Sequence, residues 1–190
     1  MLSQRPSLTP GRFLLLLLSG ALVLLVALST QATIMQRLEI EELTRLSTDV
    51  FHGQVMATET RWNAERTRIY TAVRLRINET FKGAAQRQET VTVVQLGGEK
   101  DGRRLDYAGR PEFTAGESIV LFTTRTRRNE LTVVALKQGK WQVAGNEAVR
   151  DFTGLTIVER ASAGKRLQPV AIKPERLTLD ELRTRINRAR

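Results

Sequence analysis

The chain has 190 residues, no cysteine, one histidine and a formal net charge of +10. Without cysteine, it cannot use thiolate metal ligands, a cysteine nucleophile or dithiol redox chemistry. The positive charge is mostly arginine and is densest over Lys100–Arg104, Arg125–Arg128 and Arg183–Arg190. This balance is typical either of a protein that meets anionic polymers or lipid headgroups, or of an ordinary well-solvated surface.

The N-terminus has the three parts of a secretory signal peptide. Arg5 and Arg12 precede the apolar run Phe13–Leu28, and Thr30-Gln31-Ala32 offers small residues at a cleavage site. The run has 16 residues, whereas a membrane-spanning helix needs roughly 20. We therefore predict removal of residues 1–32 and export to the periplasm or the extracellular space. The alternative is an uncleaved segment that anchors the protein in the inner membrane.

The exported part keeps 158 of the 190 residues and, without the two arginines of the signal, a net charge of +8. That length suits one compact domain. Residues 33–48 are expected to form a short N-terminal helix, because Gln36–Leu46 places apolar residues at helical spacing. Its predicted apolar face consists of Leu38, Leu43 and Leu46.

Short strands dominate residues 49–145. Ile69–Ile77 alternates apolar and polar residues with a period of two, which is the clearest strand signal in the chain. Further strands are expected over Val50–Thr58, Thr90–Gln95, Ser118–Thr124, Leu131–Ala135 and Trp141–Val143, with Gly97-Gly98 ending one of them and a short strand near Leu105–Tyr107. Many short strands at this spacing predict a mainly β fold, a small antiparallel OB-like barrel. Its interior is expected to contain Val73, Leu75, Ile77, Val91, Val93, Val120 and Phe122.

Residues 146–190 are expected to form a hairpin and a C-terminal helix. Gly154–Arg160 and Leu167–Ile172 are the two strands of the predicted hairpin. Thr178 and Glu181 have the spacing of a capping box, which marks the start of the helix. The buried face of this helix is predicted to consist of Leu179, Leu182 and Ile186.

No catalytic motif is recognisable, so we predict a protein that is not an enzyme and has no catalytic residue, metal site or cofactor. His52 is the only histidine, and a metal centre normally needs several convergent ligands. A hydrolase with paired carboxylates is a third interpretation, which two carboxylates in one cleft would favour. Its candidates are Glu39, Glu41 and Glu42 in the helix, and Asp101, Asp106 and Glu112 in a loop.

Aromatic residues within polar stretches are the candidates for a binding surface. The predicted site residues are Arg61, Trp62, Asn63, Arg103, Arg104 and Tyr107. Exposed aromatics beside arginine are the residue types that anchor interfaces. The alternative is that Trp62 covers one end of the barrel as a lid. Tyr70 beside Arg74 and Arg76 is typical of single-stranded nucleic-acid surfaces, but the predicted export argues against that partner.

Several of these segments also resemble a known family. Asp49–Val55 (DVFHGQV), Ile69–Ile77, Phe81-Lys82-Gly83 and Thr90–Gln95 resemble the opening of the netrin-like domain of tissue inhibitors of metalloproteinases. The span Leu46–Val143 is also similar to uncharacterised exported bacterial proteins. The resemblance implies an OB-type barrel. It does not imply the inhibitors' zinc chelation by an N-terminal cysteine, because this chain has no cysteine.

These observations together predict an exported, non-enzymatic binding or accessory module of the cell envelope. Its partner is expected to be an envelope or extracellular protein or an anionic polymer. The alternative is a protease inhibitor, or a protease-associated partner, that acts without cysteine-mediated zinc chelation. Contact with a membrane is expected only through an uncleaved N-terminal segment.

Overall fold

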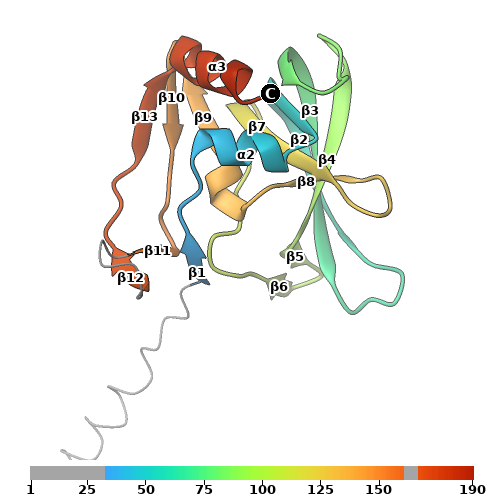
Figure 1. Cartoon of the computed structure of the whole chain (residues 1–190). Helices are drawn as coiled ribbons and strands as arrows, with labels where there is room; N and C mark the ends of the chain where they lie inside the picture. The colour runs from blue at the N-terminus through green and yellow to red at the C-terminus, as the bar shows by residue number, and fades with distance from the viewer. Residues whose placement is uncertain (1–32, 161–166) are drawn as a thin grey trace, which may run out of the picture. The chain divides into compact units, whose positions relative to one another are not determined.

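Strands make up most of the described chain, which comprises residues 33–160 and 167–190 of a computed structural model (Figure 1). The predicted signal peptide, residues 1–32, lies outside these residues. Within the described part, helix α2 (Ile40–Leu46) lies near the N-terminus and helix α3 (Leu179–Arg188) at the C-terminus. The predicted mainly β fold with a short N-terminal helix and a C-terminal helix is therefore confirmed.

The strands form three sheets. Their bounds are β1 (Thr33–Gln36), β2 (Asp49–Trp62), β3 (Ile69–Lys82), β4 (Thr90–Leu96), β5 (Gly98–Lys100), β6 (Arg103–Leu105), β7 (Ser118–Arg125), β8 (Leu131–Val133), β9 (Lys140–Ala144), β10 (Glu147–Arg150), β11 (Leu155–Arg160), β12 (Leu167–Val170) and β13 (Glu175–Thr178). A 3-10 helix, η1 (Leu136–Gly139), separates β8 from β9. The sheet orders are β1-β11-β12, β13-β10-β9-β7-β2-β3-β4-β8 and β5-β6.

Five strands of the large sheet pair in a closed order, β2–β3–β4–β8–β7 and back to β2. This ring is the part of the fold that the sequence predicts as an OB-like barrel. Its pairs are antiparallel except at β4–β8, which is parallel and consists of the single pair Val93 with Leu131. The ring is therefore weakly joined at that point and is not a fully bonded barrel. Strands β9, β10 and β13 extend the sheet outward from β7.

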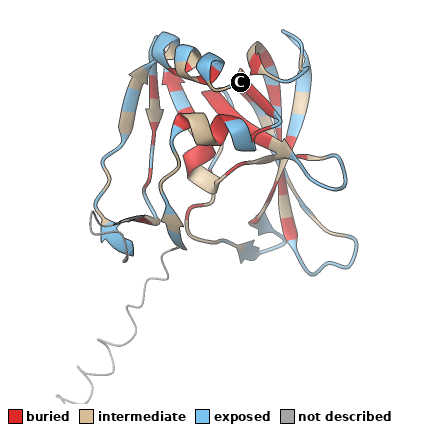
Figure 2. Ribbon diagram, in the orientation of Figure 1, coloured by how far each residue is buried: buried red, intermediate tan, exposed pale blue. Residues whose placement is uncertain are grey.

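Strand β7 is buried on both faces and separates two apolar cores (Figure 2). Ile119 and Leu121 face the interior of the ring, where they pack with residues such as Leu75. Val120 and Phe122 face the other core, between the sheet and the two helices. The prediction that Val120 and Phe122 lie inside the ring was therefore wrong. Alternate residues of β7 do face opposite sides, but the two sides are the reverse of those predicted. A strand buried on both faces has no polar residues that show which side faces the ring.

The N-terminal segment begins as a strand. Thr33–Gln36 pairs in parallel with β11, so the first residues of the predicted 33–48 helix are extended. Helix α2 starts at Ile40, which is fully buried, while the predicted core residue Leu46 is 52% exposed. Pairing with a distant strand thus overrides the local helical pattern at the start of this segment.

Both predicted elements of the C-terminal region are present. Strand β11 pairs antiparallel with β12, and Thr178 and Glu181 form the reciprocal capping box of α3. Leu182 and Ile186 are fully buried in the core that α3 shares with α2. Strands β10 and β13 were not predicted, because each has only four residues and no clear alternation.

The turn from β4 into β5 depends on Gly97 and Gly98. Their φ angles are 95° and 135°, in a region that residues with a Cβ rarely adopt. A Cβ on Gly98 would also lie 2.5 Å from the hydroxyl oxygen of Thr71. This turn brings β5 against β2 and β3, so the β5–β6 hairpin lies near the lower ends of these strands in Figure 1.

Candidate functional site

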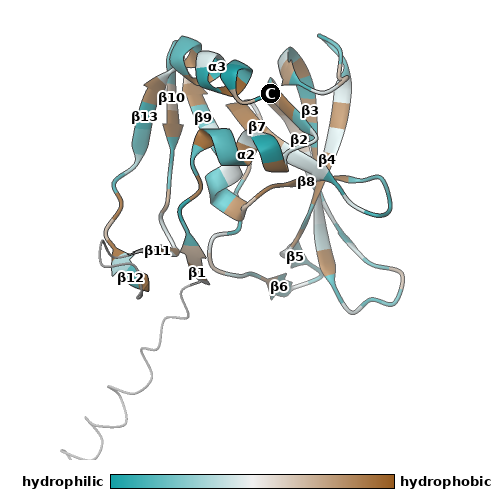
Figure 3. Cartoon of the chain, viewed as in Figure 1, coloured by the Kyte–Doolittle hydropathy of each residue, from teal (hydrophilic) through white to brown (hydrophobic). Residues whose placement is uncertain are grey.

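A groove of about 810 Å³ lies between the β2–β3 and β7–β8 connections. These two connections project on the same side of the ring (Figure 1) and are hydrophilic (Figure 3). We call this cavity the arginine groove, because its lining includes Arg61, Arg68, Arg127 and Arg128. Trp62 and Tyr70 add aromatic surface, while Glu65 and Glu130 add negative charge. The groove thus combines a positive excess with aromatic side chains.

Most of this positive charge is not neutralised within the protein. The guanidinium of Arg61 lies 3.8 Å from the carboxylate of Glu130. Among the described residues, Arg68, Arg127 and Arg128 form no ion pair, and all three are exposed. Three guanidinium groups are therefore open to an incoming anion.

Asn63, one of the predicted site residues, organises the β2–β3 connection. Its Oδ1 accepts hydrogen bonds of 2.8 Å from the backbone amides of both Thr67 and Arg68. Its Nδ2 donates to Glu65 and Thr67. The side chain of Asn63 is thus occupied within its own loop, where it sets the wall of the groove.

Trp62 is half-buried and links the groove to the β5–β6 hairpin. Its indole Nε1 donates a 2.9 Å hydrogen bond to Asp101, which also lies 3.4 Å from the guanidinium of Arg66. Trp62 belongs to neither apolar core. This location differs from that of a lid buried over the end of the ring.

The other three predicted site residues lie outside the arginine groove. Arg103 and Arg104 are exposed on β6, and Arg104 is paired with Asp106 at 3.0 Å. Tyr107 is half-buried, and burial raises the pKa of its hydroxyl. The structure therefore brings Arg61, Trp62 and Asn63 together in the groove. Arg103, Arg104 and Tyr107 lie on the neighbouring β5–β6 hairpin and the loop after it, and this hairpin contacts Trp62 through Asp101.

Asp106 holds this loop by binding two arginines. Its carboxylate accepts a 2.9 Å hydrogen bond from Arg110 and a 3.0 Å hydrogen bond from Arg104. These bonds lower the pKa of Asp106 from its ordinary value of 3.8 to about 2, with Arg110 the larger cause. A carboxyl group whose pKa is depressed by folding stabilises the folded state above its ordinary pKa. That contribution is lost as the pH falls through about 2.

We expect an NMR titration of the Asp106 carboxyl group to have its midpoint near pH 2. In an Arg110→Gln variant the midpoint should rise toward the ordinary 3.8, because the stronger of the two charged donors is gone. Arg103→Gln, a change at an exposed neighbour, is the control and should leave the midpoint unchanged. An ordinary midpoint in the unmodified protein would contradict this role of Arg110.

His52 lies on the outer side of β2 and contacts a serine. Its Nε2 is 2.8 Å from Oγ of Ser118, and burial lowers the pKa of the imidazole. Glu79, the nearby carboxylate, is held by Arg183 through two hydrogen bonds of 2.8 and 2.7 Å. Neither His52 nor Ser118 lines any of the three cavities described here, so the pair lies outside the candidate site.

A second cavity, of about 290 Å³, gathers three carboxylates, Glu112, Glu117 and Asp151. Glu117 is paired with Lys140 at 2.7 Å, and Asp151 lies 3.7 Å from Lys137. These lysines keep two of the carboxylates in ion pairs. Burial favours a higher pKa for Asp151, but hydrogen bonds from Thr153 and the charge of Lys137 outweigh it and lower this pKa. The general acid of a paired-carboxylate hydrolase needs a raised pKa instead.

Two further findings on the described residues concern metal binding and membrane spans. No three histidine, aspartate or glutamate side chains among them lie close enough together to hold a metal ion. In the same part of the chain, no helix is both long and apolar enough to cross a bilayer.

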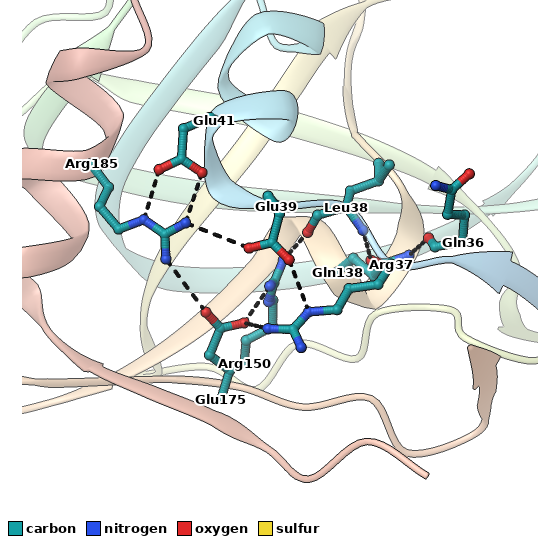
Figure 4. Close-up of polar contacts among 9 residues, drawn as sticks. All are labelled: Gln36, Arg37, Leu38, Glu39, Glu41, Gln138, Arg150, Glu175 and Arg185. Carbon is teal, nitrogen blue, oxygen red and sulfur yellow. Dashed lines mark hydrogen bonds and ion pairs between the residues drawn. The ribbon is translucent and has the colours of Figure 1, made fainter. Parts of the chain in front are cut away.

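A separate cluster of charged residues joins the N-terminal segment to the C-terminal region (Figure 4). We call it the arginine–glutamate lock, and it consists of Arg37, Glu39, Glu41, Arg150, Glu175 and Arg185. Glu175 lies at its centre and contacts three arginines: Arg150, Arg37 at 3.1 Å and Arg185 at 3.8 Å. Arg185 also binds Glu41 through two hydrogen bonds of 2.8 and 2.7 Å.

Arg150 is the buried member of the lock, with no side-chain exposure. Its guanidinium lies 4.9 Å from the ring centre of Trp141 and 5.0 Å from that of Phe152. It donates to the backbone carbonyl of Leu38 at 2.9 Å and to Glu175. Burial lowers the pKa of Arg150, and the charge of Glu175 opposes that shift. These contacts place the lock in the structural framework, away from the arginine groove.

Several groove residues were not among the predicted site residues. The sequence marks Arg127 and Arg128 only as part of a dense basic stretch, and Tyr70 only by its arginine neighbours. Basic residues that coincide with turn signals in two separate hairpins are the signal that would have predicted Arg127 and Arg128 as site residues. Arg68 gave no signal beyond its charge.

No protein-family model matches the chain, and a search of curated proteins finds no match either. The observed features define a mainly β protein with a five-stranded ring and a basic groove at two of its hairpin connections. Its function is therefore inferred from this geometry and from the sequence.

Proposed function

We propose that this protein is an exported, non-enzymatic binding module of the cell envelope that binds an extended anionic ligand in the arginine groove. The observation that carries the proposal is the convergence of four arginines with Trp62 and Tyr70 on one cavity. Guanidinium groups bind carboxylates and phosphates through paired hydrogen bonds, and they are less strongly hydrated than ammonium groups.

The position of the groove in the ring supports the proposal. OB-type folds bind extended ligands at the loops between their first and second and their fourth and fifth strands. In the ring described here, β2 and β3 are the first two strands in sequence, and β7 and β8 are the last two. The arginine groove lies between the corresponding connections.

The proposed location rests on the sequence. The basic residues, apolar run and small-residue site within residues 1–32 support export. The resemblance that the sequence suggests between Leu46–Val143 and exported bacterial proteins would agree with a role in the envelope. An exported basic protein of net charge +8 would meet anionic polymers and acidic protein segments there.

We expect the protein to bind fluorescent poly-L-glutamate and polygalacturonate, and we expect an Arg127→Glu/Arg128→Glu variant to bind each at least about tenfold more weakly. The variant replaces two open guanidinium groups with carboxylates that repel the ligand. Binding should also weaken as the salt concentration rises from 50 to 200 mM, by analogy with polyanion binding in general. Fluorescence anisotropy measures both effects.

The matched control is Arg87→Glu/Arg188→Glu, which changes the net charge by the same amount at exposed positions outside the groove. If this control weakens binding as much as the groove variant, attraction to the whole surface explains the binding and the proposed site is wrong. If the unmodified protein binds neither poly-L-glutamate nor polygalacturonate, the proposed ligand class is wrong.

A further inference from the structure

A third cavity lies at one end of the ring, beside the β5–β6 hairpin. It has a volume of about 350 Å³ and we call it the polar mouth. The residues on which the inference depends are Thr58, Thr60, Thr71, Gln95, Arg110 and Phe113. None of the residues that line the arginine groove lines this cavity.

The interior of the ring changes from apolar to polar at the polar mouth. Strand pairing places Thr60 opposite Thr71, and Thr71 opposite Gln95, so these three side chains share the inward face. One step further into the ring the same face carries Val73 and Val93, which are both fully buried. Thr58 is exposed and Thr60 is half-buried, and both line the cavity.

Gln95 supplies the second observation. Its side chain is only 5% exposed, and its Nε2 donates a 2.9 Å hydrogen bond to the carbonyl of Pro111. Its Oε1 is buried and has no hydrogen-bond partner among the described residues. The hydroxyl of Thr71, the residue paired with Gln95, already donates to the carbonyl of Gly97 at 2.7 Å. A buried carbonyl oxygen without a donor is unfavourable, so the site is suited to a water or a ligand hydroxyl.

The charges around the polar mouth are balanced. Arg104 and Arg110 line it, and both bind Asp106. Glu99 and Glu112 add negative charge to the same lining. The polar mouth therefore differs from the arginine groove, whose arginines are mostly unpaired, and it offers no net attraction to an anion.

From these observations we infer that the polar mouth binds one ring of a neutral saccharide. Threonine hydroxyls and a glutamine amide both donate and accept hydrogen bonds, as sugar hydroxyls do. Phe113 adds an apolar surface, and the volume is at the lower end of the range for ligand pockets, which suits a single ring. This second site is independent of the anionic ligand proposed for the arginine groove.

The test is an NMR titration of the purified protein with maltotriose, cellotriose and the trimer of N-acetylglucosamine. We expect saturable shifts of the Gln95 side-chain amide and the Gly98 backbone amide with at least one of these probes. A Thr58→Val/Thr60→Val variant should bind that probe at least about tenfold more weakly, because it keeps the shape of the cavity and removes two hydroxyl groups.

Two controls locate the effect. Thr92→Val, at an exposed position of β4, should leave the affinity unchanged. The Arg127→Glu/Arg128→Glu variant should also bind the sugar normally, which separates this inference from the proposed function. The inference is overturned if no trisaccharide gives saturable shifts, since the cavity then holds water only. It is overturned equally if the double valine variant binds as well as the unmodified protein.

Discussion

Replacing Arg150 with alanine is expected to destabilise the protein by about 3–5 kcal/mol, the typical cost of removing one partner from a buried ion pair. The guanidinium is fully buried between two aromatic rings, and its loss leaves the carboxylate of Glu175 without its closest partner. The backbone carbonyl of Leu38 loses its donor as well. Urea unfolding followed by tryptophan fluorescence measures the change in the free energy of unfolding.

Two further variants give this prediction a sharp control. Arg74→Ala, at an exposed position of β3, should change the free energy of unfolding by less than about 0.5 kcal/mol. Arg150→Met/Glu175→Leu removes both members of this pair and should recover much of the loss, because Arg37 and Arg185 keep Glu39 and Glu41 as partners. A loss below about 1 kcal/mol for Arg150→Ala would show that the lock contributes little to stability.

The second large effect is expected at Leu182. This residue and Ile186 are the fully buried side chains of α3, and they pack with Ile40 and Leu43 of α2. Leu182→Ala should cost about 2–5 kcal/mol, through lost burial and the cavity left behind. Thermal and urea unfolding should agree on the loss, and α3 should remain capped by Thr178 and Glu181.

Asn187→Ala is the matched control, because it is one helical position beyond Ile186 and is exposed. Its effect on stability should stay within about 0.5 kcal/mol. If Leu182→Ala were as mild as this control, α3 would have to be loosely docked, and the packing described between the two helices would be wrong.

Much of the fold follows from local patterns, and the exceptions have a common cause. Alternation identifies β3, and the capping box identifies the start of α3, because both signals depend on neighbours within a few residues. The sequence of β7 does not show which of its residues face the interior of the ring, because both faces of the strand are buried. The parallel pairing of β1 with β11 is also invisible locally, since the two strands lie far apart in the chain.

Some residues of the candidate site could likewise be predicted from local sequence, and others could not. Arg61 and Trp62 were identified because an aromatic residue in a polar stretch is a local signal. That Arg127 and Arg128 lie across the same groove depends on how two hairpins are placed by the ring. In the C-terminal basic stretch, the sequence indicates free positive charge that the fold neutralises. Arg183 and Arg185 add to the positive charge of the sequence, yet their guanidinium groups bind Glu79 and Glu41.

The arginine–glutamate lock also constrains when the chain can fold. Arg37 contacts a residue 138 positions later, and Glu41 contacts one 144 positions later. These contacts of Arg37 and Glu41 with the C-terminal region therefore form only when the ribosome has made nearly the whole chain. Contacts of such long range slow folding, because the loop between them must close first. In a chain with a predicted export signal, we therefore expect the N-terminal segment to complete its docking last, when synthesis is almost finished.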